Sequence, residues 1–209
     1  MKIFIAGDYW SCTGPALVTK NLITGSNPQI LYLKTRNKIL RSIEIFYKTL
    51  FANAVVYSGF SRQNILGFHI ASLFHRPSFY LMHGSIYYEN LINEADASAM
   101  VDQESVMLQS ADFILAVSKT FETWLKEQYP QYHHKIYTLT NGIDWDIINS
   151  PSNSSKKISG QILSVGGGMP QKNILAICKA IDKIYEADSN CSYRLPKTVN
   201  DSINQVMSA

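Results

Sequence analysis

Short apolar runs alternate with amphipathic stretches along the first 140 residues of the chain. The apolar runs are rich in β-branched and aromatic residues, which is typical of strands. They fall at 2–6, 29–34, 54–58, 78–84, 112–118 and 135–140. Between them, apolar side chains at helical spacing predict a helix that begins at Pro15, one that begins at Lys38, one that runs from Ser61 to about His75, and one over 120–128. The polar stretch from 85 to about 109 carries no predicted element.

This order of elements predicts an α/β fold. A strand followed by a helix, repeated with continuous rather than alternating apolar strands, indicates a parallel sheet covered on both faces. We therefore expect one doubly wound, Rossmann-like domain over residues 1–146. In such a sheet the ligand lies beyond the carboxyl ends of the strands. The loops of interest are then 7–14, 58–61, 83–88, Ser118 and 141–144.

A second unit is predicted to begin after a linker. The linker is predicted over 147–160, because residues 150–160 are rich in serine and nearly free of apolar side chains. A strand over 161–166 then runs into three glycines, a proline and Lys172, before a helix at 173–185 with Ile174, Ile177, Ile181 and Ile184 on one stripe. We expect residues 161–187 to start a second Rossmann-like domain that stays incomplete, followed by an irregular tail at 188–209.

Composition excludes several classes of protein. The net charge of +3 is too small to argue for nucleic acid by itself. Cys12, Cys178 and Cys191 are scattered without a Cys-x-x-Cys pair, which fits a reducing compartment better than a disulfide framework. The N-terminus does not have the pattern of a signal peptide, and no stretch approaches the ~20 apolar residues of a membrane-spanning helix. A cytoplasmic chain is expected.

A basic, aromatic segment stands out within the predicted helix at 38–51. Residues 34–48 carry Lys34, Arg36, Lys38, Arg41 and Lys48 against the single acid Glu44, a local net charge of +4. Phe46, Tyr47, Leu50 and Phe51 accompany them. Such a helix is typical of a contact with a membrane surface or an anionic acceptor. A core helix with a solvated basic face explains the pattern about as well.

Four segments, taken in order, resemble one family. They are Gly14-Pro15 after the first strand, His83-Gly84 after the fourth, ADFILAVS followed by NGID at 141–144, and ILSVGGGMPQKN at 162–173. Together they resemble glycosyltransferase family 4, the retaining GT-B enzymes that use nucleotide-sugar donors. The resemblance implies transfer of a sugar to a lipid-linked oligosaccharide during capsule, O-antigen or other surface polysaccharide assembly. It also implies peripheral contact with the inner face of the cytoplasmic membrane and no metal cofactor.

The resemblance implies roles for particular residues. His83 would reach the donor sugar as the catalytic histidine, although a structural histidine that bonds a loop carbonyl is the alternative. Gly14, Gly166, Gly167 and Lys172 would contact the donor diphosphate, since glycines allow close approach and a helix N-terminus favours anions; a tight turn with an exposed lysine is the alternative. Asn141 is a further donor-binding candidate, but a turn with positive φ at Asn141-Gly142 explains that pair better. The acceptor or membrane contacts would be Arg36, Lys38, Arg41 and Lys48.

The chain also departs from the family pattern. The family's donor domain carries two glutamates eight residues apart, whereas Glu186 is the only glutamate after Glu127 here. Gly167 replaces the family's arginine beside the first donor-domain glycine. We therefore expect a truncated, inactive glycosyltransferase, with a non-catalytic acceptor- or partner-binding domain, or one half of a split enzyme, as alternatives. Another type of GT-B enzyme fits less well. His133 and His134 are expected to be surface residues and not metal ligands.

Overall fold

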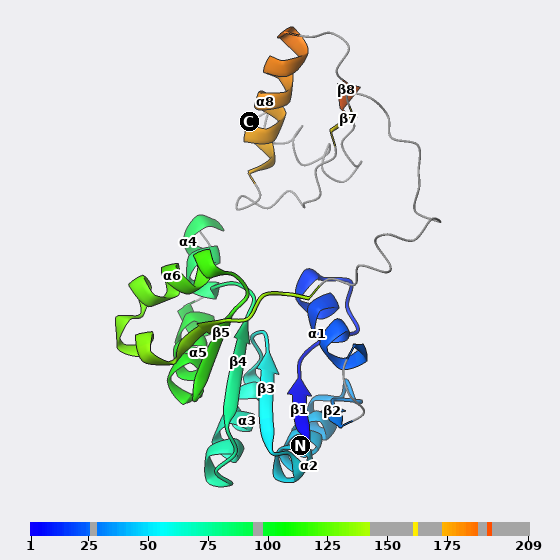
Figure 1. Cartoon of the computed structure of the whole chain (residues 1–209), viewed down its shortest axis with the longest axis vertical. Helices are drawn as coiled ribbons and strands as arrows, with labels where there is room; N and C mark the ends of the chain where they lie inside the picture. The colour runs from blue at the N-terminus through cyan, green and yellow to red at the C-terminus, as the bar shows by residue number, and fades with distance from the viewer. Residues whose placement is uncertain (26–28, 94–97, 143–160, 163–172, 188–191, 194–209) are drawn as a thin grey trace. The chain divides into compact units, whose positions relative to one another are not determined.

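The computed structural model of the chain describes residues 1–25, 29–93, 98–142, 161–162, 173–187 and 192–193 (Figure 1). It divides into two compact units, which are described separately. The first comprises residues 1–87 and 97–143, and the second comprises residues 88–96 and 144–209.

The first unit is built on a six-stranded sheet in which all neighbouring strands are parallel. The strands are β1 (Ile3–Ala6), β2 (Ile30–Tyr32), β3 (Ala54–Ser58), β4 (Ser78–Met82), β5 (Phe113–Ala116) and β6 (Ile136–Thr138). Their order across the sheet is β2-β1-β3-β4-β5-β6. This confirms the predicted α/β class and a Rossmann-like, parallel arrangement. The chain adds β2 on one side of β1 and β3 to β6 on the other, so the strand order reverses between β1 and β3.

Helices connect these strands. They are α1 (Gly14–Thr24), α2 (Lys38–Phe51), α3 (Arg62–Leu73), α4 (Ile86–Asn93), α5 (Ser98–Ser110) and α6 (Lys119–Gln128), followed by the 3₁₀ helix η1 (Pro130–Lys135). From Tyr88 onward, the residues of α4 belong to the second unit. The sequence pattern missed α4, α5 and η1. It also ran α3 too far: the helix ends at Leu73, because His75 takes a left-handed φ of 51° and the Arg76 N–H returns to the Ala71 carbonyl, which closes the last turn.

One face of the sheet is closed. Tyr57, Tyr80, Ile114 and Ile136 lie side by side in register across β3 to β6, and all four are buried. The helices α2, α3 and α5 pack next to one another on this face. The fit is tight enough that a Cβ on Gly67 of α3 would lie 2.4 Å from the Tyr57 ring.

The other face is covered less completely than the sequence pattern predicted. Helix α1 lies over the β1 and β3 end of this face, where Thr19 contacts Ser58. Farther along, Phe79 and Phe113 stack at 4.8 Å between ring centroids, and Phe113 lies 6.0 Å from Tyr137. Phe79 and Phe113 are half-buried and Tyr137 is exposed. Within the described residues of this unit, the predicted cover by helices is therefore complete on one face and partial on the other.

The second unit holds β7 (Gln161–Ile162), α8 (Ile174–Ala187) and β8 (Ser192–Tyr193). Strand β8 pairs in parallel with β7, so the segment predicted as an irregular tail contains a two-residue strand. On α8 the buried stripe consists of Ile174, Cys178 and Ile181, whereas Ile184 is exposed, because the side chains at i, i+4 and i+7 share a face. The predicted linker, 147–160, lies outside the described residues. None of the helices described in either unit is both long and apolar enough to cross a membrane.

Candidate functional site

The carboxyl ends of β1, β2, β3 and β4 gather chemically active side chains at one edge of the sheet. Because the strand order turns between β1 and β3, a crevice is expected there, and ligands of doubly wound sheets bind at such points. Two groups of residues occupy this edge. The first is a pocket between the loop after β1 and the start of α2, and the second is a chain of hydrogen bonds that ends at His83.

The loop after β1 folds on itself before α1 begins. The Asp8 carboxylate accepts the backbone N–H groups of Trp10 at 2.9 Å and of Ser11 at 3.3 Å. At the other end of the loop, the Thr13 side chain accepts the N–H of Ala16 and caps α1. These contacts hold Trp10 and Ser11 in fixed positions at the carboxyl edge of the sheet.

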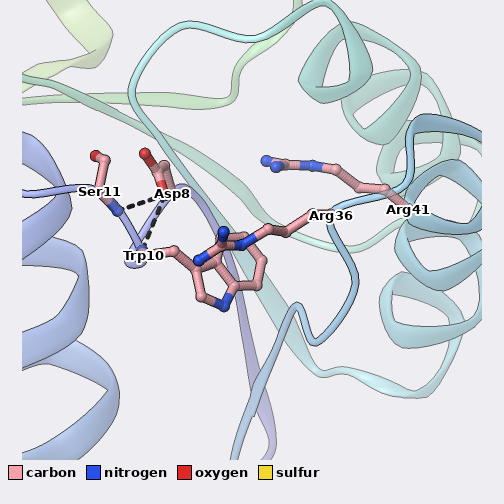
Figure 2. Close-up of a pocket in the computed structure, with 5 residues that line it drawn as sticks. All are labelled: Asp8, Trp10, Ser11, Arg36 and Arg41. Carbon is pink, nitrogen blue, oxygen red and sulfur yellow. Dashed lines mark hydrogen bonds between the residues drawn. The ribbon is translucent and has the colours of Figure 1, made fainter.

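Asp8, Trp10, Ser11, Arg36 and Arg41 line a pocket of about 300 Å³. Figure 2 shows that both guanidinium groups extend toward the loop after β1. Arg36 lies over the Trp10 indole, 5.4 Å from the ring centroid, while Tyr9 stacks on the same indole at 4.1 Å. The Tyr9 hydroxyl donates to the Leu33 carbonyl, which ties this aromatic pair to the segment after β2. A cation–π contact of this kind fixes the position of Arg36 while its N–H groups remain available.

Arg41 projects from the first turns of α2 and is half-buried. Its Nε is buried and has no hydrogen-bond partner among the described residues. Burial lowers the pKa of Arg41, against the opposing effect of the Asp8 and Glu44 charges. A guanidinium nevertheless stays protonated at neutral pH. A buried N–H without a partner costs free energy, which a ligand oxygen in the pocket would recover.

Asp8 supplies the negative wall of the pocket. Burial acts to raise the pKa of Asp8, but the Ser11 side chain, the N–H groups of Trp10 and Ser11 and the nearby Arg41 charge outweigh it. The pKa of Asp8 therefore lies below its ordinary value, and the carboxylate is charged at neutral pH. The pocket thus offers two cations and one anion to a ligand.

The predicted basic contacts separate into different environments. Arg36 and Arg41 share the pocket, and Lys38 is exposed at the start of α2. Lys48 instead turns inward: its ammonium donates to the Glu44 carboxylate and to the Tyr32 carbonyl and lies 5.8 Å from the Tyr32 ring centroid. Glu44 also accepts the N–H groups of Lys34 and Thr35. The structure therefore brings two of the four predicted residues together and uses Lys48 to tie α2 to β2.

The outer side of α2 is apolar. Ile39, Ile43, Tyr47 and Phe51 follow one another at four-residue spacing and are 74, 50, 56 and 64% exposed. We call these four residues the α2 stripe. Leu40 and Phe46 beside it are exposed as well, whereas the buried side of the helix presents Ile45 and Thr49. The alternative of a core helix with a solvated basic face is therefore wrong, because apolar residues of α2 also face outward.

A chain of three hydrogen bonds reaches His83 at the end of β4. The Thr19 hydroxyl donates to the Pro15 carbonyl at 2.9 Å and lies 2.7 Å from the Ser58 hydroxyl. The Ser58 hydroxyl in turn lies 2.9 Å from Nε2 of His83. Gly7 allows this approach, because a Cβ there would lie 2.8 Å from the Ser58 Cβ. Burial lowers the pKa of His83 below its ordinary value, so the imidazole is neutral at pH 7.

The predicted donor-binding residues fare differently. Gly14 is the first residue of α1, and a Cβ there would meet open space, so nearby packing does not require glycine. Asn141 is exposed beyond β6, and neither Asn141 nor Gly142 takes a positive φ, so the predicted left-handed turn is wrong. The remaining donor candidates, Gly166, Gly167 and Lys172, lie outside the described residues. His133 and His134 are exposed in η1 as expected.

The loops 7–14 and 58–61, which the sequence analysis selected, contain Asp8, Trp10 and Ser58, but none of these side chains was singled out, and Thr19 was missed. The spacing of Asp8 before Trp10 and Ser11 carries a local signal, since an aspartate often accepts N–H groups two and three residues ahead. Thr19 and Ser58 carry no such signal, because they are 39 residues apart and meet only across the sheet. Within the residues that the structure describes, no group of three or more His, Cys, Asp or Glu side chains is placed to hold a metal ion.

Comparison with known proteins adds no relative. The sequence matches none of the family models against which it was scanned, and no curated protein matches it.

Proposed function

We propose that residues 1–142 form the acceptor-binding domain of a retaining, GT-B-type glycosyltransferase that resembles family 4. The observation that carries this proposal is the pocket of Asp8, Trp10, Arg36 and Arg41 at the carboxyl edge of a parallel sheet. This is the edge at which α/β domains bind their ligands. The order of sequence motifs supports the assignment to this kind of enzyme.

The pocket suits a ligand that carries both phosphate and hydroxyl groups. Arginine binds phosphate through two parallel N–H bonds, and two arginines can hold a diphosphate. Arg36 is oriented by Trp10, and Arg41 has an N–H in need of an acceptor. The Asp8 carboxylate on the facing wall can accept a hydroxyl of an attached sugar. A sugar linked through a diphosphate to a lipid has both kinds of group, the phosphates for the two arginines and, next to them, the sugar hydroxyls for Asp8.

The α2 stripe supports a lipid-linked acceptor. A helix with an apolar outer face and nearby cations lies flat in the interface of an anionic bilayer. Lys34, Arg36 and Lys38, all exposed, precede the stripe at the start of α2. If α2 lies in the interface, an acceptor whose tail remains in the bilayer brings its headgroup close to Arg36 and Arg41. We propose the inner face of the cytoplasmic membrane as this surface and surface polysaccharide assembly, of capsule or O-antigen, as the setting.

The donor side of the reaction remains a set of predictions. His83 would face the transferred sugar, and Gly14, Asn141, Gly166, Gly167 and Lys172 would contact the nucleotide diphosphate. No residue of the proposed mechanism requires a metal ion. The parent reaction would transfer the sugar with retention from the nucleotide to the acceptor hydroxyl, with Lys172 neutralising the leaving diphosphate.

A second candidate is a binding module without transfer activity. One observation favours it: the described residues that line the pocket, and those of the α2 stripe, belong to the first unit. Such a module would hold an anionic, lipid-linked ligand and would bind no nucleotide. It could also serve as one half of a split enzyme whose donor half is a separate chain.

Calorimetric titration of the full chain with inorganic pyrophosphate tests the pocket. We expect Arg41→Gln to weaken binding by about tenfold or more, in line with a lost charge-assisted hydrogen bond. Arg62→Gln is the matched control, because Arg62 is an exposed arginine on α3 whose Nε donates to Gln103, away from the pocket. Lys172→Ala identifies binding at the predicted donor loop. Binding that is equally strong in Arg36→Gln and Arg41→Gln would contradict the pocket as the anion site.

Titration with UDP, GDP and their sugars separates the two candidates. A glycosyltransferase should bind one of these nucleotides and lose it in Lys172→Ala. Pyrophosphate binding that depends on Arg41, without binding of any nucleotide, would instead favour the binding module.

A further inference from the structure

The hydroxyl groups of Thr19 and Ser58 form a chain that ends on one nitrogen of His83. Thr19 belongs to α1, Ser58 ends β3 and His83 follows β4. Thr19 and Ser58 are only 1 and 5% exposed, so water does not compete for their hydrogen bonds. Each hydroxyl has one proton to donate, and a carbonyl oxygen has none. The direction of every bond in the chain can therefore be worked out from its far end.

The Pro15 carbonyl fixes the first donor. It can only accept, so the 2.9 Å contact with Thr19 uses the single Thr19 proton. The Ser58 proton must then point to Thr19, 2.7 Å away. With its proton so used, the Ser58 oxygen can only accept from Nε2 of His83 at 2.9 Å. The opposite direction would leave the Thr19–Pro15 contact without a proton and would lose one of the three bonds.

We infer that Thr19 and Ser58 are positioning residues that hold His83 as the tautomer with its proton on Nε2. The ring nitrogen Nδ1 is left with a free lone pair, and within the described residues it makes no hydrogen bond. A neutral histidine held in this way accepts a proton or a hydrogen bond at Nδ1 and donates none there. The free-protein tautomer does not depend on the proposed function. Only the identity of the group that would bind at Nδ1 rests on the proposed function.

The backbone beside these hydrogen bonds packs closely around the Thr19 and Ser58 side chains. A Cβ on Gly7 would lie 2.8 Å from the Ser58 Cβ and 3.0 Å from the Thr19 methyl group. Gly59 takes a left-handed φ of 71° directly after Ser58, and its N–H donates to the Leu81 carbonyl of β4. The turn after β3 is thus hydrogen-bonded to β4 beside His83, which fixes the backbone that carries the Ser58 hydroxyl.

Long-range ¹H–¹⁵N correlation spectra of the full, ligand-free chain at neutral pH test the inference. Such spectra distinguish protonated from unprotonated ring nitrogens for each of the five histidines. The His83 signals are assigned by their loss in His83→Gln. We expect His83 to show a protonated Nε2 and an unprotonated Nδ1. The tautomer protonated on Nδ1 in the wild-type chain would overturn the proposal.

Thr19→Val is the decisive variant, because valine keeps the shape of threonine and removes its hydroxyl. The Ser58 proton then loses its acceptor and turns to Nε2, so the His83 proton moves to Nδ1. We expect the tautomer ratio to change by at least about fivefold, the effect of one hydrogen bond. Thr19→Ser should restore the wild-type ratio.

Thr24→Val is the matched control. Thr24 lies on the same helix and makes the same kind of bond, from its hydroxyl to the Lys20 carbonyl, but it is exposed and does not contact Ser58. It should leave the tautomer unchanged. If Thr19→Val does not fold, Ser58→Ala gives the second test, since His83 then loses its fixed partner and should become a mixture of tautomers. A His83 that keeps its proton on Nε2 in folded Thr19→Val or Ser58→Ala, to the same extent as in the control, would contradict the inference. Pyrophosphate and nucleotide binding are measured separately, so their absence would bear on the proposed function alone.

Discussion

Helices α2 and α6 are built alike on their inner sides and differently on their outer sides. Both follow a strand of the same sheet and both carry a Glu–Lys pair at four-residue spacing. Glu44 of α2 accepts from Lys48 and from the N–H groups of Lys34 and Thr35, after β2. Glu122 of α6 accepts from Lys126, from Lys119 and from the Thr138 hydroxyl of β6. In each case a carboxylate ties the helix to the neighbouring strand or to the loop after it.

The outer sides of these two helices differ in the kind of residue that they expose. The exposed residues of α6 are polar, namely Lys119, Thr120, Thr123, Glu127 and Gln128. The exposed residues of α2 are the α2 stripe, Leu40 and Phe46, with Lys38 as the polar exception. Water alone accounts for the surface of α6. The exposed apolar residues of α2 are the observation on which the proposed contact of this helix with a membrane surface rests.

Charging the α2 stripe should have the largest effect. We expect Ile43→Glu/Tyr47→Glu to reduce binding to anionic phosphatidylglycerol vesicles by more than about tenfold, since burial of one such side chain contributes roughly 1.5–3 kcal/mol. Cosedimentation of the full chain with the vesicles measures it. Thr120→Glu/Thr123→Glu adds the same charge to α6 and should change binding far less. Equal losses in the two variants would show that net charge, and not the stripe, governs binding.

Removing the carboxylate of Glu122, which ties α6 to β6, should have the second largest effect. Glu122→Gln should lower the free energy of unfolding by about 1–3 kcal/mol at pH 7, because Glu122 is buried and accepts charge-assisted hydrogen bonds. The side-chain hydrogen bonds of Lys119, Lys126 and Thr138 lower the pKa of Glu122 to about 2, from an ordinary value of 4.5. Since the folded pKa is the lower one, this stabilisation is present above pH 4.5 and is lost as the pH falls toward 2.

Urea unfolding at pH 7 and pH 3 measures this loss. The free energy of unfolding of the wild-type chain should fall more than that of Glu122→Gln over that interval, so the difference between the two free energies should become smaller. A gap that stays constant with pH would contradict an ionised, hydrogen-bonded Glu122.

Removing the charge of Lys38 should have a smaller effect on membrane contact. A lysine near an anionic bilayer contributes about 1 kcal/mol, so Lys38→Gln should weaken vesicle binding about fivefold at low salt and less as salt is added. Lys126→Gln, on α6, serves as the comparison and should leave vesicle binding nearly unchanged. A loss that does not depend on salt would speak against an electrostatic role for Lys38.

Glu44→Gln should have the smallest effect on stability, not more than about 1 kcal/mol, because Glu44 is nearer to solvent than Glu122. It should nevertheless weaken pyrophosphate binding several-fold, because Glu44 holds the loop from which Arg36 projects. Glu122→Gln should leave pyrophosphate binding unchanged. If calorimetry showed that Glu122→Gln weakens pyrophosphate binding more than Glu44→Gln does, the proposed effect of Glu44 on the pocket would be wrong.

The sequence predicted the fold where local chemistry decides it. Strand β3 and helix α2 have the predicted bounds, since an unbroken apolar run makes a buried strand and Asn37 caps α2 by accepting the N–H groups of Ile39 and Leu40. Helices α4 and α5 were missed because a distant residue organises them. Glu104, buried within α5, accepts the N–H groups of Ile86 and Tyr87 at the start of α4. No spacing rule joins residues that far apart.

The candidate site was predictable only in part for the same reason. The charge of the segment 34–48 pointed to Arg36 and Arg41, but periodicity cannot tell which side of an apolar helix faces the sheet. The four-residue spacing of Glu44 and Lys48 could have shown that Lys48 is engaged within the helix. Asp8 and Trp10 line the pocket because hydrogen bonds to the backbone shape the loop that carries them. Ser58 contacts His83 only because β3 and β4 are neighbours in the sheet.

The order of strands across the sheet bears on how the chain is synthesised. Strand β1 is made before the other five strands of the sheet but lies between β2 and β3, so its second edge is not satisfied until β3 has been made. Once residue 58 is available, β2, β1 and β3 can assemble, and β4, β5 and β6 then add one by one along a single growing edge in the order of translation. The residues of Figure 2 all belong to the part that is translated first, so the arginine pocket can form on the nascent chain before the strand that carries His83 has joined the sheet.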